Sequence, residues 1–114
     1  MASEGLMQNR LCSGASLEIE FDAFVALLEI RSSNQMHLEI VGGDNKGFVD
    51  DFLYELHWVR DDVAVLSFQE HIGTTVTHVI DFAASRAYTT VAPASGGFLR
   101  LMGRVQFSSQ PPST

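Results

Sequence analysis

The stretch DFLYELHWVRDDVAVLSFQEHIGTTVTHVIDF, residues 51–82, decides the fold class of this chain. It contains three runs rich in Val, Ile, Phe, Tyr and Thr, at residues 51–60, 63–70 and 74–82, separated by the short turns Asp61-Asp62 and His71-Ile72-Gly73. Alternation of polar and apolar residues with a period of two is typical of β-strands, and turns this short join antiparallel neighbours. The stretch therefore predicts three consecutive antiparallel strands.

The same pattern continues on both sides of this stretch. It predicts further strands at residues 17–21, 24–30, 36–41, 86–92 and 98–107. A meander of eight strands exposes two edges unless it closes, and eight strands close around a space that side chains nearly fill or that holds one small ligand. We therefore predict an all-β fold, an eight-stranded antiparallel up-and-down barrel. A two-sheet sandwich shares this strand pattern and stays open as an alternative, as does a helical segment over residues 23–31.

Length and composition predict one domain. The chain has 114 residues, of which 46% are apolar, enough for a single core. Residues 1–13 lack periodicity and residues 108–114 form a Ser/Pro-rich tail, so we expect a flexible N-terminal segment, a barrel domain over residues 14–107 and a disordered tail.

The charge balance excludes some partners. Fourteen acidic residues against seven basic ones give a net charge of −7, which opposes binding to nucleic acid or to an anionic membrane surface. Cys12 is the single cysteine, and no export signal or membrane span is visible, so we expect a cytoplasmic protein. No His or Cys spacing converges on a metal site, and we expect neither a metal nor a cofactor.

Two segments of the second half carry a family resemblance. They are Val65-Leu66-Ser67-Phe68-Gln69-Glu70 and Gly73-Thr74-Thr75-Val76-Thr77-His78-Val79-Ile80-Asp81-Phe82, followed by Ala87-Tyr88-Thr89-Thr90 and the run from Phe98 to Gly103. This pattern resembles the MoaF-like family of small calycin-type proteins, although Phe68 stands where that family usually has Trp. The resemblance implies a lipocalin-like barrel that binds a small organic molecule, and some barrels of this type catalyse reactions in the cavity.

Hairpin geometry predicts which side chains face inward. If Asp61-Asp62 pairs Arg60 with Val63, then Glu55 lies opposite Phe68, and pairing Glu70 with Thr75 continues the same face. Arg100 and Arg104 of the last strand belong in water, which favours this face as the interior. A β-bulge in the strands at 51–60 or 63–70 would exchange some of these positions. The predicted cavity then holds Glu55, His57, Phe68, Glu70, Thr77, Asp81 and Tyr88.

Within that predicted cavity, two groups are candidates for proton transfer. Glu70 ends a strand near the barrel mouth, where partial burial would raise its pKa and suit it to general acid or base catalysis. His57 is the second catalytic candidate. We expect the ligand-binding residues to be Glu55, Phe68, Thr77, Asp81 and Tyr88.

The opposite face predicts an interaction surface. If it is exposed, it presents an apolar stripe that a homodimer would cover, formed by Tyr54, Leu56, Trp58, Val65, Ile80 and Met102. Three functions follow from these patterns: binding of an apolar or aromatic organic ligand, a cofactor-independent isomerase, cyclase or lyase that uses a cavity carboxylate, or a filled barrel that acts as a homo-oligomeric interaction module.

Overall fold

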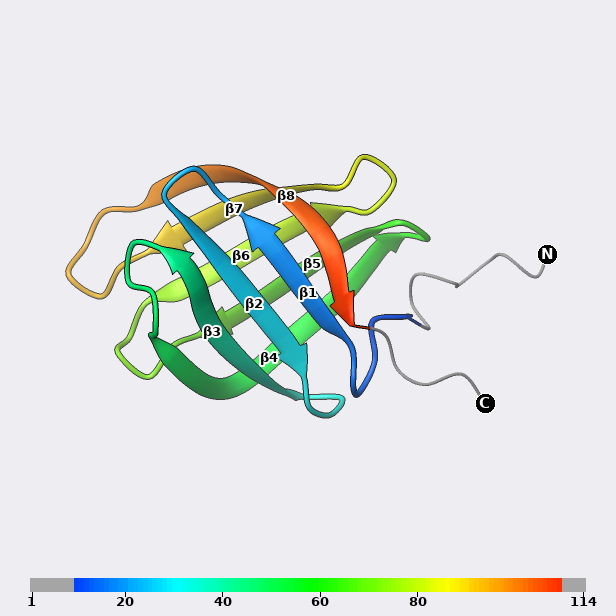
Figure 1. Ribbon diagram of the computed structural model, residues 1–114, viewed down its shortest axis with the longest axis horizontal. Coiled ribbons are helices and arrows are strands. Elements are labelled where there is room, and N and C mark those ends of the chain that lie inside the picture. Colours follow the sequence, from blue (N-terminus) through cyan, green and yellow to red (C-terminus); the bar gives the residue numbers. More distant parts are fainter. Residues whose placement is uncertain (1–9, 110–114) are drawn as a thin grey trace.

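Eight strands run up and down around a closed barrel in a computed structural model that describes residues 10–109 (Figure 1). The strands are β1 (Ser16–Glu20), β2 (Phe24–Ile30), β3 (Gln35–Gly43), β4 (Val49–Arg60), β5 (Val63–Gln69), β6 (Thr75–Asp81), β7 (Arg86–Ala92) and β8 (Leu99–Ser109). Each strand pairs antiparallel with the next, and β8 pairs with β1. The predicted barrel is confirmed. The sandwich is wrong, and so is the helix over residues 23–31, because that segment forms β2.

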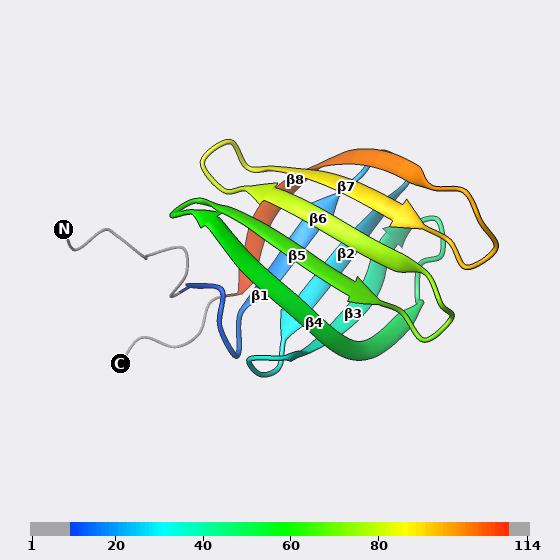
Figure 2. The same ribbon diagram turned by 180° about the vertical axis from the view of Figure 1, so that it is seen from behind.

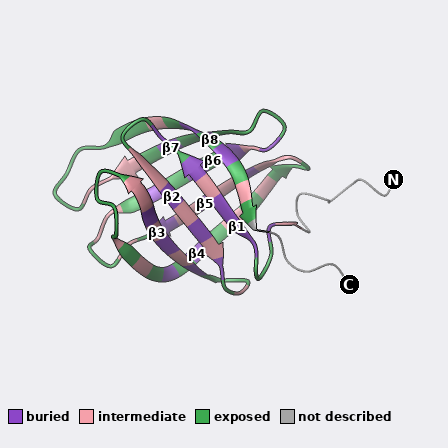
Figure 3. Ribbon diagram, viewed as in Figure 1, coloured by how far each residue is buried: buried purple, intermediate pink, exposed green. Residues whose placement is uncertain are grey.

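Strand alternation fills the barrel with apolar side chains. Ile19, Leu66 and Ile80 are fully buried, and Figure 3 shows buried and less buried positions alternating along the strands. A closed barrel has no free edge, so one inward residue in every two is enough to make the core.

One end of the barrel is plugged. The ring of Phe82 stacks on that of Trp58, with centroids 5.7 Å apart, and on that of Phe107, with centroids 5.8 Å apart. The guanidinium of Arg10 lies over the Phe107 ring. Leu11, which precedes β1 in the chain, is also buried, at 4% exposure. The loops that join β1 to β2, β3 to β4, β5 to β6 and β7 to β8 gather at the opposite end (Figures 1 and 2). We call this the open end.

Residues 1–9 of the expected N-terminal segment and residues 110–114 of the expected tail lie outside the described residues. No helix within residues 10–109 is long and apolar enough to cross a membrane.

Two local irregularities overturn the predicted inward face. Arg60 does pair with Val63, but Val59 forms a bulge, so Trp58 pairs with Ala64 and Tyr54, not Glu55, lies opposite Phe68. One extra residue on one strand moves every side chain beyond the bulge, counted from the turn, to the other face of that strand.

The β5–β6 turn contributes the second shift. The backbone N–H of Glu70 donates to the carbonyl of Thr74, so the loop holds the three residues His71-Ile72-Gly73, and Gly73 adopts a left-handed conformation with φ of 96°. Phe68 therefore pairs with Val76 rather than Thr77. The predicted face is correct for Phe68 of β5 and for β8, where Arg100 and Arg104 are exposed, and wrong for β4, β6 and β7.

Candidate functional site

A cavity of about 410 Å³ lies inside the open end of the barrel. Its wall is mainly apolar and comes from strands around the barrel and from the loops at this end. The lining residues are Phe21, Phe24, Ala26, Leu38, Ile40, Asp44, Asn45, Phe48, Phe68, Glu70, Ile72, Thr74, Val76, His78, Thr89, Val91, Pro93, Leu99 and Leu101. A concave, largely apolar site of this size with a few polar groups is typical of small-molecule pockets.

Aromatic rings form much of the wall. The rings of Phe21 and Phe24 lie 4.9 Å apart, and Phe68 stacks on Phe52 with centroids 4.2 Å apart. The imidazole of His78 lies between these groups, 5.7 Å from Phe68 and 6.4 Å from Phe21. Packing against neighbouring rings restricts each side chain, so the cavity is largely preformed.

His78 and Thr89 are the polar pair in the depth of the cavity. They lie on neighbouring strands, directly opposite one another, and the Nδ1 atom of His78 is 2.7 Å from the Thr89 hydroxyl. Both residues are 3% exposed. Burial disfavours the charged imidazole and lowers the pKa of His78 to about 4, so the ring is neutral at pH 7.

The second ring nitrogen of His78 faces the cavity. Nε2 has no hydrogen-bond partner within residues 10–109, whereas every fully enclosed side-chain nitrogen or oxygen there has one. Nε2 is therefore in contact with the cavity space that His78 lines. A neutral imidazole offers one donor and one acceptor, so this atom can make one hydrogen bond to a bound molecule.

Two carboxylates stand at the cavity mouth. Glu70 is half-buried at the end of β5, and Asp44 is exposed in the β3–β4 loop. Neither has an ion-pair partner in the described part of the chain. Burial, with a smaller contribution from the negative charge of Asp50, raises the pKa of Glu70.

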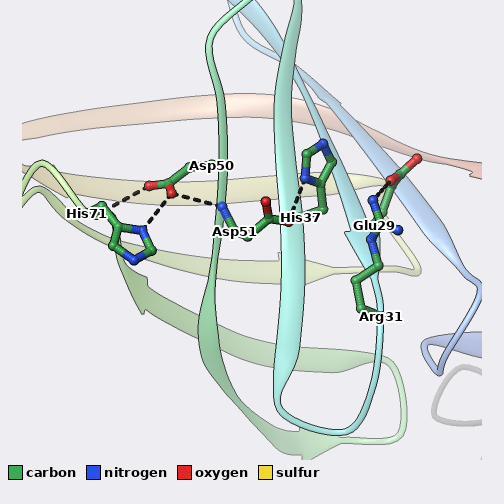
Figure 4. A network of polar contacts seen from close by, with 6 residues as sticks. All are labelled: Glu29, Arg31, His37, Asp50, Asp51 and His71. Atoms are coloured by element: carbon green, nitrogen blue, oxygen red, sulfur yellow. Dashed lines mark hydrogen bonds and ion pairs between the residues drawn. The ribbon is translucent and has the colours of Figure 1, made fainter.

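Asp50 fixes the loop that carries Glu70. Its carboxylate accepts hydrogen bonds from the backbone N–H groups of His71 and Asp51, at 2.9 Å and 2.8 Å, and lies 2.7 Å from Nδ1 of His71 (Figure 4). Burial alone would raise the pKa of Asp50, but these hydrogen bonds outweigh it and the pKa is lowered. Asp50 therefore ties the β5–β6 loop to the start of β4.

Two surface pairs extend this polar region away from the cavity. Asp51 lies 2.7 Å from Nδ1 of His37, and Glu29 accepts a 3.0 Å hydrogen bond from Arg31 (Figure 4). The carboxylates of both pairs are more exposed than that of Asp50. The two pairs therefore lie on the outer surface of β2, β3 and β4 and do not reach the cavity.

The structure brings two of the predicted site residues to the cavity, Glu70 and Phe68. The predicted inward placement is wrong for the others. His57 and Glu55 are exposed on the outside of β4, where they lie 3.6 Å apart, and Thr77 and Tyr88 also face outward. Asp81 accepts a hydrogen bond from the backbone of Ala84 in the β6–β7 turn, at the plugged end.

The predicted interface stripe is largely wrong for the same reason. Tyr54 and Ile80 are buried at 7% and 0% exposure, and Leu56 and Trp58 pack against the core. The hydroxyl of Tyr54 donates to the carbonyl of Ser32. Met102 is exposed at 58%, and Val65 is partly exposed on the outer face of β5.

Sequence reasoning missed the polar pair and Asp44. The predicted register puts His78 on the face opposite Glu70, although the alternation Val76-His78-Ile80 against Thr75-Thr77-Val79 marks it as inward on its own strand. Nothing in the sequence singled out Asp44, which reaches the cavity mouth from a loop of turn-forming residues.

Metal binding by clustered side chains finds no support in the described residues. No group of three His, Cys, Asp or Glu side chains within residues 10–109 could hold an ion.

Fold and cavity together define a class: a small, closed antiparallel barrel with a preformed apolar cavity at one end. Within this class, the family described as MoaF-like matches residues 13–106, so the chain belongs to the MoaF-like family.

Among solved structures, a protein from Burkholderia vietnamiensis described provisionally as a beta-lactamase is 29% identical. It superposes with a TM-score of 0.79 over 83% of this chain and 93% of that one. None of the curated proteins matches this chain.

Proposed function

We propose that the protein binds a small, mainly apolar organic molecule in the cavity at the open end. The observation that carries this proposal is the Nε2 atom of buried, neutral His78, which faces a 410 Å³ apolar cavity without a hydrogen-bond partner within residues 10–109. A polar group kept in such a place costs folding free energy unless something bonds to it. A ligand with one hydrogen-bonding group would satisfy it.

The test uses the neutral probe N-phenyl-1-naphthylamine, which becomes brightly fluorescent in apolar surroundings. We expect saturable binding to the wild-type protein at one site. Val76→Phe places a ring in the cavity and should weaken binding at least tenfold. Val79→Phe is the matched control, because Val79 lies on the same strand with its side chain outside the barrel.

Two results would overturn the proposal: no saturable binding, or equal loss of binding in both variants. Melting curves check that Val76→Phe folds. Leu101→Phe, which alters the cavity from β8, gives a second variant if it does not.

Proton transfer inside the cavity is a second candidate function, favoured by the half-buried Glu70 with its raised pKa. It would make the protein an isomerase, cyclase or lyase without a cofactor. Kemp elimination of 5-nitrobenzisoxazole reports any base in an apolar site: the base removes the carbon-bound proton as the N–O bond breaks. A rate above that of Glu70→Gln supports this candidate, and equal rates contradict it.

The cavity wall does not support a serine-based mechanism for β-lactamase activity, the activity named for the Burkholderia protein. The described cavity wall offers the hydroxyls of Thr74 and Thr89 but contains no serine. The third predicted function, a filled barrel, disagrees with the cavity volume. Homodimerisation and a cytoplasmic location stay predictions, which sedimentation and cell fractionation would check.

A further inference from the structure

We propose that the ligand is an organic amine whose mainly apolar body lies among the phenylalanines of the cavity, with a hydrogen-bonding group toward Nε2 of His78, and whose ammonium group lies at the mouth between Glu70 and Asp44. This inference rests on the proposed binding function and adds the charge of the ligand to it.

The open end carries an excess of negative charge. Its loops and strand ends carry the carboxylates of Asp22, Asp44, Asp50 and Glu70. Asp50 is engaged by His71, whereas Glu70 and Asp44 line the cavity without a cationic partner among the described residues. A mouth of one sign, set on low-dielectric walls, attracts a ligand of the opposite sign and repels one of the same sign.

The basic residues at this end make no ion pair with the carboxylates of the mouth in the described part of the chain. Arg100 lies over the ring of Phe98, 4.8 Å from its centroid, and Lys46 is exposed in the β3–β4 loop. Neither forms an ion pair within residues 10–109, and neither lines the cavity.

The wall suits a cation as well as an apolar body. Phe21, Phe24, Phe48 and Phe68 line the cavity, and the face of an aromatic ring attracts a nearby ammonium group. An alkyl or aryl body buries apolar surface on the same rings.

His78 gives the independent reason to regard this end as a ligand site. It is 3% exposed and lines the same cavity as the two carboxylates, and its Nε2 atom has no hydrogen-bond partner within the described chain. A patch of acidic residues on an ordinary surface has no such group beneath it.

Three probes with one body separate the effect of charge from that of apolar contact: 4-phenylbutylamine, 4-phenylbutan-1-ol and 4-phenylbutanoate. Their affinities are measured at pH 7 by displacement of N-phenyl-1-naphthylamine. We expect the amine to bind at least tenfold more tightly than the alcohol, and the carboxylate at least tenfold more weakly than the alcohol. The preference for the amine should fall as salt is added.

Glu70→Gln and Asp44→Asn each remove one negative charge from the mouth. We expect either variant to reduce the affinity ratio of amine to alcohol at least threefold, and the double variant to bring that ratio close to one. Glu55→Gln is the matched control, because it removes the same charge from the outer face of β4 and should leave the ratio unchanged.

The outcomes distinguish the two proposals. If the naphthyl probe does not bind, the binding function itself fails. If the probe binds but amine and alcohol compete equally, or if Glu55→Gln lowers the ratio as much as Glu70→Gln, the amine assignment is overturned and the binding function stands.

Discussion

His78 is an ionisable residue buried inside the barrel, at 3% exposure. It is enclosed by apolar groups, paired with Thr89 and neutral at pH 7. Its burial lowers the free energy of unfolding at any pH where the imidazole binds a proton in the unfolded chain but not in the folded one.

This cost predicts a specific pH dependence of stability. The pKa of His78 falls from 6.5 to about 4 on folding, so the unfolded state binds the extra proton between these values. Stability present above pH 6.5 should therefore be lost as the pH falls to 4, by about 3 kcal/mol. In His78→Phe/Thr89→Val, which removes both polar partners, urea unfolding should show a flatter profile over this range. A profile as steep as that of the wild type would contradict the assignment.

Glu70 predicts the opposite sign. Its folded-state pKa is raised, so the ligand-free protein loses stability as the pH rises from about 4.5 through the folded pKa. At pH 7, Glu70→Gln should melt at a higher temperature than the wild type, and the difference should close below pH 4.5. Glu55→Gln, on the outer surface, should show little change. A lower melting temperature for Glu70→Gln at pH 7 would mean that the carboxylate stabilises the fold.

At the scale of the elements, all eight strands were predictable from the period-two pattern, but the inward face was predicted wrongly for β4, β6 and β7. In β4 the apolar positions Phe52, Tyr54, Leu56 and Trp58 alternate with polar or exposed ones, and the pattern of this strand alone indicates the buried face. The prediction instead carried one register across two hairpins. The bulge at Val59 and the three-residue β5–β6 loop each shift pairing by one residue, and period-two patterning does not reveal either.

The candidate site was predictable only where this error had no effect. Phe68 and Glu70 belong to β5 and its end, where the predicted face is correct, and both line the cavity. In β4, β6 and β7 the prediction chose the outward residues as the inward ones. His57 was therefore expected inside the barrel, although it is exposed, and His78 was not recognised as an inward residue.

The β5–β6 loop depends on one carboxylate. Asp50→Asn should weaken the contacts to His71 and cost about 1–2 kcal/mol. It should also speed amide hydrogen exchange at His71 and Gly73. The lowered pKa of Asp50 means that its stabilisation is present above pH 3.8 and lost as the pH falls further, so the two proteins should converge in acid. Asp51→Asn, at an exposed carboxylate, serves as the control; an equal effect there would contradict a specific role for Asp50.

At the scale of the whole molecule, closure between β8 and β1 holds the barrel together. Gly103 lies at this seam, and a Cβ atom there would lie 2.7 Å from Ile19 and 2.9 Å from Phe21. Gly103→Ala should therefore cost about 1–3 kcal/mol in urea unfolding, because it overpacks the seam. Gly42→Ala is the control, since its Cβ would meet its nearest neighbour at 3.4 Å. Equal stability of the two variants would show that the seam can relax.

The molecule is asymmetric along the barrel axis: aromatic stacking plugs one end, and an acid-rimmed cavity occupies the other. The central claim is that a ligand enters at the open end. Amide chemical shifts measured during titration with 4-phenylbutylamine test it most directly. We expect saturable shifts at Thr74, Val76, His78 and Thr89, and none at Trp58 or Phe82. Shifts confined to the outer positions Val79, Tyr88 and Met102, or the absence of saturable shifts, would contradict the claim.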